Sequence, residues 1–239
     1  MSNPYFKFKQ FTVYHDLCAM KVGIDGVLLG AWSPLDVNMA SILDVGTGSG
    51  LITLMLAQRT ANAHIDAIDI DEGAISQATI NCDKSPWRDR ISVQNISLQD
   101  FAPACTRKYD LIVSNPPYFT NSLKAPDPTR SKARHTDTIS HQELLLHSAG
   151  ILKKTGRICL ILPVTEGLQC VKYAESFSLF CYQCIYVHPK PEAEAKRVLL
   201  EFGFTERTTL ISNLEIETLQ RHSYSEAFTQ LAKDFYLKL

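Results

Sequence analysis

The chain has 239 residues, within the size range of a single α/β domain. It is 45% hydrophobic and 21% charged, ordinary values for a soluble globular protein. Its net charge of −1 excludes a uniformly basic nucleic-acid-binding surface, so any basic footprint must be local. No apolar run is long enough to cross a membrane, and we expect no membrane partner.

The seven cysteines do not form the paired C-x-x-C motifs typical of a metal site. Cys181 and Cys184 are the nearest approach, but they lie within an expected strand, flanked by Tyr182 and Ile185, and no second pair exists. The odd count and the absence of a signal peptide favour reduced thiols. We therefore expect a cytoplasmic protein that holds no metal.

The first 35 residues precede the first expected strand of the central sheet. They predict a short hairpin or arm that leads to a turn at Asp25-Gly26 and then to the start of an apolar helix. Such a segment can close over a ligand, and packing on the edge of the sheet explains it equally well. We expect one domain at 1–239, with an arm or lid at 1–35 and a core at 36–239.

A glycine-rich turn follows the first buried strand, which we expect at 41–45. The turn runs from Asp44 to Gly50 and contains Gly46, Gly48 and Gly50, which let the backbone turn tightly and approach a ligand. The next stretch, 51–59, has the apolar pattern of a helix. The spacing is G-x-G-x-G and not the G-x-G-x-x-G of dinucleotide binders.

The next expected strand, 65–69, ends on an acidic residue. Asp69 is placed where a carboxylate can accept hydrogen bonds from both hydroxyls of a ribose. Asp66 and Asp71 are alternatives, and Asp71 can equally cap the helix expected at 72–84. Together, the glycine turn and Asp69 predict a nucleotide-like cofactor.

The rest of the chain continues to alternate between strands and helices. Ser140 and Glu143 form the pattern of a capping box that opens a helix through Leu152, and Gly156 is expected to end it. A further helix is expected at 165–177. The remaining strands are expected at 91–96, 109–114, 157–163, 182–188 and 197–204. This order predicts a doubly wound, mostly parallel sheet of seven strands, with the last pair antiparallel.

Asn115-Pro116-Pro117-Tyr118 follows the apolar strand at 109–114 and is the most informative motif in the chain. The exocyclic nitrogen of adenine is a poor nucleophile because its lone pair is delocalised into the ring. The Asn115 amide oxygen and the Pro116 carbonyl can accept hydrogen bonds from its two N–H groups and turn the lone pair out of plane. The prolines fix the backbone, and Tyr118 offers a face for stacking. No general base is required.

A basic stretch comes directly after this motif. It has four cations and one anion, with a neutral histidine, and its prolines indicate an irregular loop. We expect its basic side chains to contact an anionic RNA, although a solvated loop is the ordinary explanation of a charge run. The expected RNA contacts are Lys124, Arg130, Lys132, Arg134 and His135.

As a whole, the chain resembles the bacterial tRNA1(Val) (adenine(37)-N6)-methyltransferases, which are class I S-adenosylmethionine-dependent enzymes. The resemblance is carried by motifs along almost the whole chain. They are the N-terminal block with Phe8 to Phe11 and His15 to Trp32, the glycine turn, Ser85 to Trp87, Asn115 to Tyr118, Arg197 to Leu200 and the C-terminal block from Tyr224 to Leu237. The methyltransferase motifs are generic, and the two terminal blocks are the specific part.

This resemblance implies a cytoplasmic enzyme that transfers a methyl group from S-adenosylmethionine to N6 of the adenine beside a tRNA anticodon. The catalytic residues would be Asn115, Pro116, Pro117 and Tyr118. The third strand lacks the acidic residue that many relatives place at its end, and the residues leave Ser97 and Asp100 as alternatives for binding the adenine of the cofactor. The expected cofactor-binding residues are Asp44, Gly46, Gly48, Gly50, Asp69, Ser97 and Asp100.

Other functions compete with this hypothesis. A nicotinamide dehydrogenase would share the glycine turn and Asp69, but it would not explain Asn115 to Tyr118. A protein-glutamine methyltransferase would present the same planar amide, and a DNA or rRNA base methyltransferase would use similar chemistry. The former usually has a helical N-terminal domain, and the latter a larger recognition insertion or a duplicated domain. A non-catalytic RNA-binding module would not need both Asn115 and Asp69.

Overall fold

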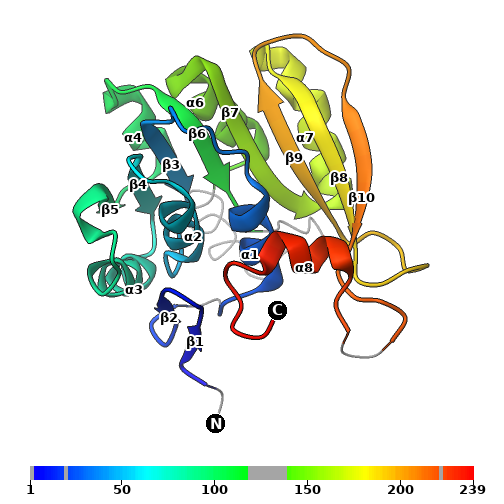
Figure 1. The fold of residues 1–239 in the computed structure, drawn as a ribbon. Helices are drawn as coiled ribbons and strands as arrows, with labels where there is room; N and C mark the ends of the chain where they lie inside the picture. The colour runs from blue at the N-terminus through cyan, green and yellow to red at the C-terminus, as the bar shows by residue number, and fades with distance from the viewer. Residues whose placement is uncertain (1–2, 19–20, 118–138, 221–222) are drawn as a thin grey trace, which may run out of the picture.

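The computed structural model describes residues 3–18, 21–117, 139–220 and 223–239, and Figure 1 shows their arrangement. Among these residues, the central sheet has eight strands in the order β10-β8-β9-β7-β6-β3-β4-β5. All run parallel except β9, which is antiparallel to both neighbours. The strands are β3 (Ser41–Val45), β4 (His64–Asp69), β5 (Ile91–Asn95), β6 (Tyr109–Ser114), β7 (Leu152–Pro163), β8 (Phe180–His188), β9 (Arg197–Gly203) and β10 (Leu210–Glu215).

Helices cover both faces of this sheet, as the doubly wound prediction requires (Figure 1). Successive residues of a strand point to opposite faces, so Ile42 packs in one buried cluster with α1 and α2, and Leu43 packs in the other with α6 and α7. Both faces are therefore apolar, which explains the continuous hydrophobic runs in the sequence. The helices are α1 (Ile24–Trp32), α2 (Leu51–Arg59), α3 (Glu72–Asp83), α4 (Leu98–Ala104), α6 (His141–Ile151), α7 (Val164–Ala174) and α8 (Glu226–Ala232).

The expected hairpin near the N-terminus is confirmed, and it is formed by β1 (Tyr5–Lys7) and β2 (Thr12–Tyr14). The expected turn at Asp25-Gly26 is wrong, because α1 begins at Ile24 and both residues lie in its first turn. Gly26 is needed for close packing, since a Cβ there would lie 2.9 Å from Leu51 Cδ2 of α2. The buried residues of α1 belong to the larger apolar cluster, whereas the proposed boundary between arm and core near residue 35 stays a prediction.

The capping box at Ser140 and Glu143 is confirmed, but the helix does not extend to Gly156. α6 ends at Ile151, and Leu152 already has extended backbone angles and pairs with Tyr109 of β6. Gly156 lies inside β7, where a Cβ would come within 2.8 Å of the Tyr109 carbonyl oxygen. This glycine therefore permits close strand packing and does not end a helix.

The antiparallel pairing of β8 and β9 is confirmed. The sheet also has a strand that the sequence did not predict, β10, which pairs parallel to β8 at the edge. Five of its six residues are exposed and only Leu214 is buried, so it lacks the apolar run that revealed the other strands.

The order of the strands reverses direction between the neighbouring strands β3 and β6. β3 pairs with β4 on one side and with β6 on the other, and the chain leaves β3 and β6 in opposite directions across the sheet. In a doubly wound sheet, ligands bind at the carboxyl ends of strands at such a switch point. The glycine turn follows β3 and Asn115 follows β6, so the two motifs meet there.

None of the described helices has the length and apolarity needed to span a bilayer.

Candidate active site

The glycine turn connects β3 to α2 through three glycines with positive φ. The angles are +72° at Gly46, +56° at Gly48 and +79° at Gly50, all in the region that side-chain-bearing residues rarely adopt. The Gly46 and Thr47 N–H groups both donate to the Ile68 carbonyl of the neighbouring strand, at 2.9 and 3.1 Å. The turn is therefore held by the backbone of β4.

Asp69 braces this turn from the end of β4. The Gly48 N–H donates to its Oδ2 at 2.9 Å, and the Asp71 N–H donates to its Oδ1 at 3.0 Å. The Asp69 carboxylate is only half-buried, so it keeps a side open to the cleft. Asp71 is the N-cap of α3, where its side chain accepts from the Ala74 N–H at 2.6 Å. Asp66 lies on the amino side of the strand, where it accepts from the Tyr109 hydroxyl at 2.7 Å.

Asp44 lies behind the turn and not in the cleft. It is fully buried, and its Oδ2 accepts from the hydroxyls of Thr47 and Thr53 at 2.8 and 2.7 Å. Burial raises the pKa of Asp44 to about 6, although the two threonine hydrogen bonds oppose the shift. Gly50 also faces away, since a Cβ there would lie 3.5 Å from Ala78 of α3. These two residues support the turn from the protein side.

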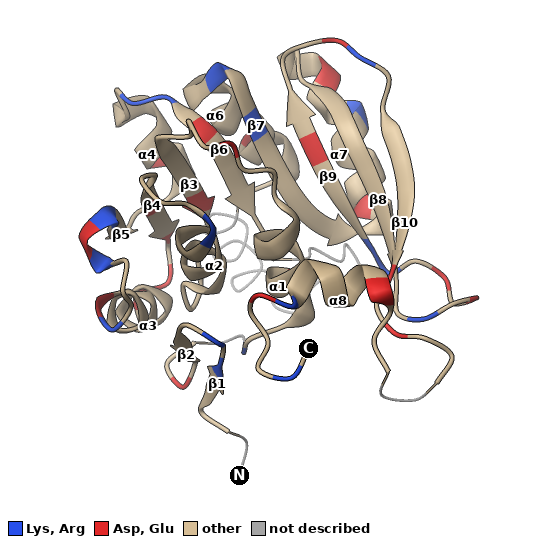
Figure 2. Ribbon diagram, viewed as in Figure 1, with Lys and Arg blue, Asp and Glu red and all other residues tan. Residues whose placement is uncertain are grey.

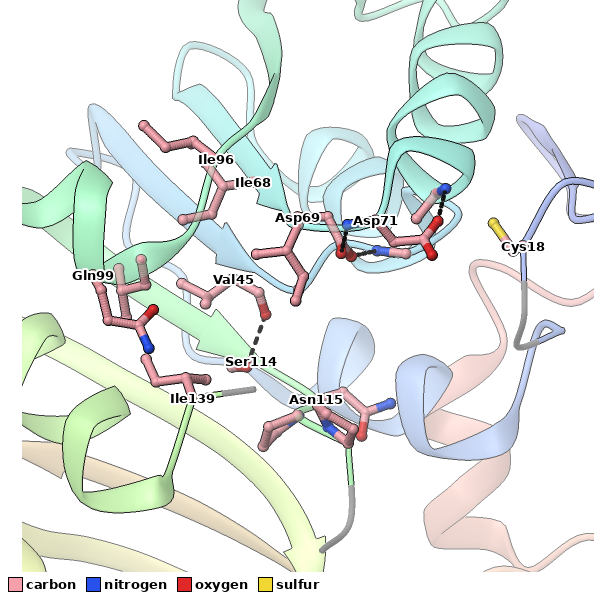
Figure 3. Close-up of a pocket in the computed structure, with 17 residues that line it drawn as sticks. Cys18, Val45, Ile68, Asp69, Asp71, Ile96, Gln99, Ser114, Asn115 and Ile139 are labelled. Atoms are coloured by element: carbon pink, nitrogen blue, oxygen red, sulfur yellow. Dashed lines mark hydrogen bonds between the residues drawn. The ribbon is translucent and has the colours of Figure 1, made fainter. Parts of the chain in front are cut away.

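A cleft opens in front of the turn, with an empty volume of about 970 Å³ that includes open solvent (Figure 3). Gly46 and Gly48 line it, and a Cβ on either would meet no atom within 4 Å. The missing side chains thus leave room for a ligand beside the backbone. Further lining comes from apolar side chains at the strand ends, at the start of α4 and just before α6, namely Val45, Ile68, Ile70, Ile96, Leu98 and Ile139.

After the end of β5, the residues that line the cleft are not Ser97 and Asp100, which were the expected ones. Ser97 is the N-cap of α4, where its Oγ accepts from the Asp100 N–H at 3.1 Å and donates to Asp100 Oδ2 at 2.6 Å. The cleft lining does not include these two, and Gln99 between them lies in it together with Leu98. The sequence analysis missed Gln99, although its position just after a strand end was a usable signal.

Cys18 is a second lining residue that the sequence analysis missed. It comes from the segment that follows β2, and Figure 3 shows its sulfur directed toward the side of the cleft where Asp71 lies. Burial, with the neighbouring carboxylates of Asp69 and Asp71, raises the pKa of the Cys18 thiol to about 11. The thiol is therefore protonated at neutral pH and is not an activated nucleophile.

Asn115, Pro116 and Pro117 form the opposite side of the cleft, at the end of β6. The preceding Ser114 donates its hydroxyl to the Val45 carbonyl at 2.8 Å, which ties the end of β6 to the end of β3. Asn115 is half-buried and Pro116 is buried. Figure 3 shows the Asn115 amide directed away from the apolar part of the cleft. The glycine turn and this motif therefore face one cavity.

Some expected site residues lie outside the described part of the chain. They are Tyr118 and the basic residues Lys124, Arg130, Lys132, Arg134 and His135. Among the described residues, no cluster of three or more His, Cys, Asp or Glu side chains is arranged to hold a metal ion.

The residues present fit a nucleoside with a short polar tail. A carboxylate that can accept hydrogen bonds from hydroxyl groups, an apolar slot for a flat ring, and open glycine backbone occur in one cleft. The adjacent Asn-Pro-Pro motif carries amide and carbonyl oxygens, which are hydrogen-bond acceptors. A nucleotide-like methyl donor beside an amino-group substrate matches both sides.

Known proteins agree with this geometry. Residues 28–173 match the model of the methyltransferase small domain family. Among solved structures, a predicted O-methyltransferase from Agrobacterium tumefaciens superposes with a TM-score of 0.70 at 16% identity, over 88% of this chain and 96% of that one. A ribosomal protein L11 methylase from Lactobacillus delbrueckii superposes with a TM-score of 0.56 at 16% identity, over 79% and 82% of the chains. These likenesses show the fold.

The fold and the site define a class I methyltransferase, for which S-adenosylmethionine is the methyl donor. Relatives that align with the full length of this chain identify the group more closely. Proteins of Parabacteroides distasonis and Phocaeicola vulgatus, both named tRNA1(Val) (adenine(37)-N6)-methyltransferase, are 52% and 49% identical over 100% of both chains. A protein of the same name from Trichodesmium erythraeum is 45% identical over 100% of both chains. The chain belongs to the tRNA1(Val) (adenine(37)-N6)-methyltransferase family.

Proposed function

We propose that this protein transfers a methyl group from S-adenosylmethionine to N6 of adenine 37 in the anticodon loop of tRNA1(Val). The observation that carries the proposal is the shared cleft, with the glycine turn and Asp69 on one side and Asn115-Pro116 on the other. The names of the full-length relatives supply the target. A cytoplasmic location follows from a tRNA substrate.

The cofactor side of the cleft would bind S-adenosylmethionine through few groups. When bound, this cofactor supplies a methyl group activated on a sulfonium. Asp69 would accept hydrogen bonds from the ribose hydroxyls, while Gly46 and Gly48 would allow the backbone to approach the methionine part. Gln99 can pair with the edge of the adenine ring, since its amide both donates and accepts. Ser97 and Asp100 then act indirectly, because they cap the helix that carries Gln99.

The target side orients the reacting nitrogen. The Asn115 Oδ1 and the Pro116 carbonyl accept the two N–H groups of the adenine, which aims the nitrogen lone pair at the methyl carbon. The hydrogen bond from Ser114 to Val45 fixes the start of this motif relative to the cofactor side. Tyr118 supplies a stacking face. Alignment of the reacting atoms provides much of the rate, and no side chain removes a proton before attack.

The basic stretch after Tyr118 is proposed to hold the RNA phosphates. A target base in an anticodon loop is only partly stacked, so turning it out costs a few kcal/mol at most. Recognition then depends on loop shape and phosphates, which Lys124, Arg130, Lys132, Arg134 and His135 would contact.

Mass spectrometry of nucleosides tests this function. Purified tRNA1(Val) should lose N6-methyladenosine at position 37 when the gene is deleted, and purified protein should restore it. A transcript with guanosine at position 37 should not be methylated. If tRNA is unchanged while an rRNA base, a DNA base or a protein glutamine loses its methyl group, the alternative target of this amino-nitrogen chemistry is correct. A chain that binds RNA and transfers no methyl group would be a binding module.

A further inference from the structure

The N-terminal hairpin presents two chemically different faces. β1 and β2 pair Tyr5 with Tyr14, Phe6 with Val13 and Lys7 with Thr12. Since side chains alternate along a strand, Phe6 and Val13 point toward the core. We call the opposite side, formed by Tyr5, Lys7, Thr12 and Tyr14, the outer hairpin face.

The inner side of this hairpin is firmly attached to the protein. Val13 is fully buried, and the Phe6 ring packs against Phe8 at 4.7 Å and against Tyr236 at 5.6 Å between centroids. The Lys9 N–H donates to the Phe235 carbonyl at 2.8 Å. The outer hairpin face therefore has a fixed orientation, and Tyr5 on this face is 41% exposed.

Aromatic and cationic groups alternate on the outer hairpin face. The Tyr5 and Tyr14 rings lie 5.8 Å apart at 52°, and Lys84 Nζ lies 4.5 Å from the centroid of the Tyr14 ring. Lys7 and Lys84 are both exposed. The chain has a net charge of −1. Residues 3–14 contain two lysines and no acidic residue (Figure 2). Asp16 and Asp83 are the nearest acidic residues in the sequence and lie outside the paired strands.

One buried side chain connects this face to the active site. Asn81 of α3 accepts from the Tyr14 N–H at 3.0 Å and donates to the Tyr14 carbonyl at 2.8 Å. The same Asn81 amide nitrogen donates to the Ser49 carbonyl in the glycine turn at 2.8 Å. Four residues beyond Tyr14, Cys18 lines the cofactor cleft. The outer hairpin face thus lies on the same edge of the molecule as the cleft (Figure 1).

We propose that the outer hairpin face, together with Lys84, is a second RNA-binding surface that holds substrate nucleotides next to the reacting base. An unpaired base stacks on Tyr5 and Tyr14, and phosphates lie against Lys7 and Lys84. Stacking on aromatic rings beside cations is the usual way in which single-stranded nucleotides are bound. The absence of acidic side chains between residues 3 and 14 matches a polyanionic partner. This inference rests on the proposed function, because it extends the binding site of the same RNA.

Binding of the unmodified tRNA to the full-length protein, measured with S-adenosylhomocysteine present, tests the proposal. Replacing Tyr5 and Tyr14 together by Ala should weaken binding by roughly ten-fold or more, because a base stacked on an aromatic ring contributes about 1–3 kcal/mol. Replacing both by Phe should keep binding within about two-fold, since stacking needs only the ring. Replacing Lys7 and Lys84 by Ala should lower the slope of log K against log salt by about 1.4, at about 0.7 per phosphate of a single strand.

The matched control removes the same number of lysines from a different part of the surface. Lys154 in β7 and Lys172 in α7 are exposed at the opposite end of the sheet, so replacing both by Ala should leave the salt slope unchanged. Affinity for S-adenosylhomocysteine and the melting temperature should be those of the wild type in every variant. If the Ala variants bind tRNA as wild type does, or if Phe is as damaging as Ala, the surface is not an RNA platform.

The test also separates this proposal from the proposed function. If the wild-type protein methylates no tRNA, the function is wrong whatever the hairpin binds. If it methylates tRNA1(Val) and the hairpin variants do so with an unchanged Michaelis constant for tRNA, only the second RNA surface is wrong. Specific capture of a protein partner through Tyr5 and Tyr14, with normal tRNA binding, would also overturn it.

Discussion

The two sides of the cleft are built differently. The cofactor side, formed by the glycine turn and Asp69, is braced by backbone hydrogen bonds to Ile68 and by the Asp69 carboxylate. The target side begins at Ser114, where a hydrogen bond to Val45 fixes the end of β6, and then continues from Asn115 into the proline motif. The cofactor side is a turn held by several hydrogen bonds, and the target side is the end of a strand that continues into the Asn-Pro-Pro motif. Cofactor binding and methyl transfer should therefore fail separately.

The sharpest test of this separation is Asn115→Ala. It removes the proposed acceptor for the reacting nitrogen and leaves in place the hydrogen bonds of the glycine turn to Ile68 and Asp69, so kcat should fall about 10³-fold. The dissociation constant for S-adenosylhomocysteine, measured by calorimetry, should stay within about two-fold. Asn38→Ala is the matched control, since Asn38 is exposed just before the start of β3, at the end of the sheet opposite the cleft, and should have little effect on kcat. A large loss of cofactor affinity in Asn115→Ala would mean that the two sides are one unit.

The buried support of the cofactor side should make stability depend on pH. The folded-state pKa of Asp44 is raised to about 6 from an ordinary 3.8, so the folded protein holds this proton more tightly than the unfolded chain. The resulting stabilisation is fully present below about pH 4 and is lost as pH rises through 6. Its contribution to the free energy of unfolding is at most about 3 kcal/mol. Urea unfolding between pH 4 and 8 should show this fall relative to Asp44→Asn, which lacks the titrating group. A constant difference between the two proteins would contradict it.

Asp69→Ala should weaken S-adenosylhomocysteine binding about 10- to 100-fold, because a charged acceptor is lost and Gly48 loses its brace. Asp71→Ser is the comparison, since serine keeps an N-cap for α3 while it removes a second charge from the same part of the cleft. Asp71→Ser should weaken S-adenosylhomocysteine binding clearly less than Asp69→Ala does. Calorimetry in the presence of EDTA should give the same affinities, and tight NAD binding in place of S-adenosylhomocysteine would refute the cofactor assignment.

Replacing Arg130, Lys132 and Arg134 together by Ala should act only on RNA. We expect an apparent Michaelis constant for tRNA raised by about ten-fold and a weaker salt dependence of binding, with cofactor affinity unchanged. Methylation kinetics across a salt series measure both. Normal kinetics in the triple variant would mean that this stretch is only a solvated connection. The RNA-binding face would then be sought around Lys7, Lys9 and Lys21 or around Lys196 and Arg197.

Tyr118→Phe should have the smallest effect, within about three-fold in kcat/KM, because stacking uses the ring and not the hydroxyl. Tyr118→Ala should lose more, since it removes the stacking face. Methyl transfer to tRNA by the two variants measures the difference. If Phe is as inactive as Ala, the hydroxyl has a role that stacking does not explain.

The sequence by itself determined the order of the buried strands and the identity of the two motifs. The strands at 41–45, 65–69 and 109–114 are visible because most of their residues are apolar, as expected for strands covered by helices on both faces. Gly46 and Gly48 are recognisable for a similar reason, since few residues other than glycine adopt their positive φ. The capping box at Ser140 was local chemistry that needed no tertiary contact.

The tertiary structure alone decided what depends on contacts distant in sequence. β10 forms because β8 offers it an edge, and its own exposed residues carry no strand signal. Gly156 serves close packing against Tyr109, which no pattern around it reveals. Ser97 and Asp100 hydrogen-bond to each other, and Gln99 between them lines the cleft. Cys18 reaches the same cleft from the segment that follows β2. Asn81 connects Tyr14 to the glycine turn across 67 and 32 residues of chain, because a buried amide must find its partners wherever the fold places them.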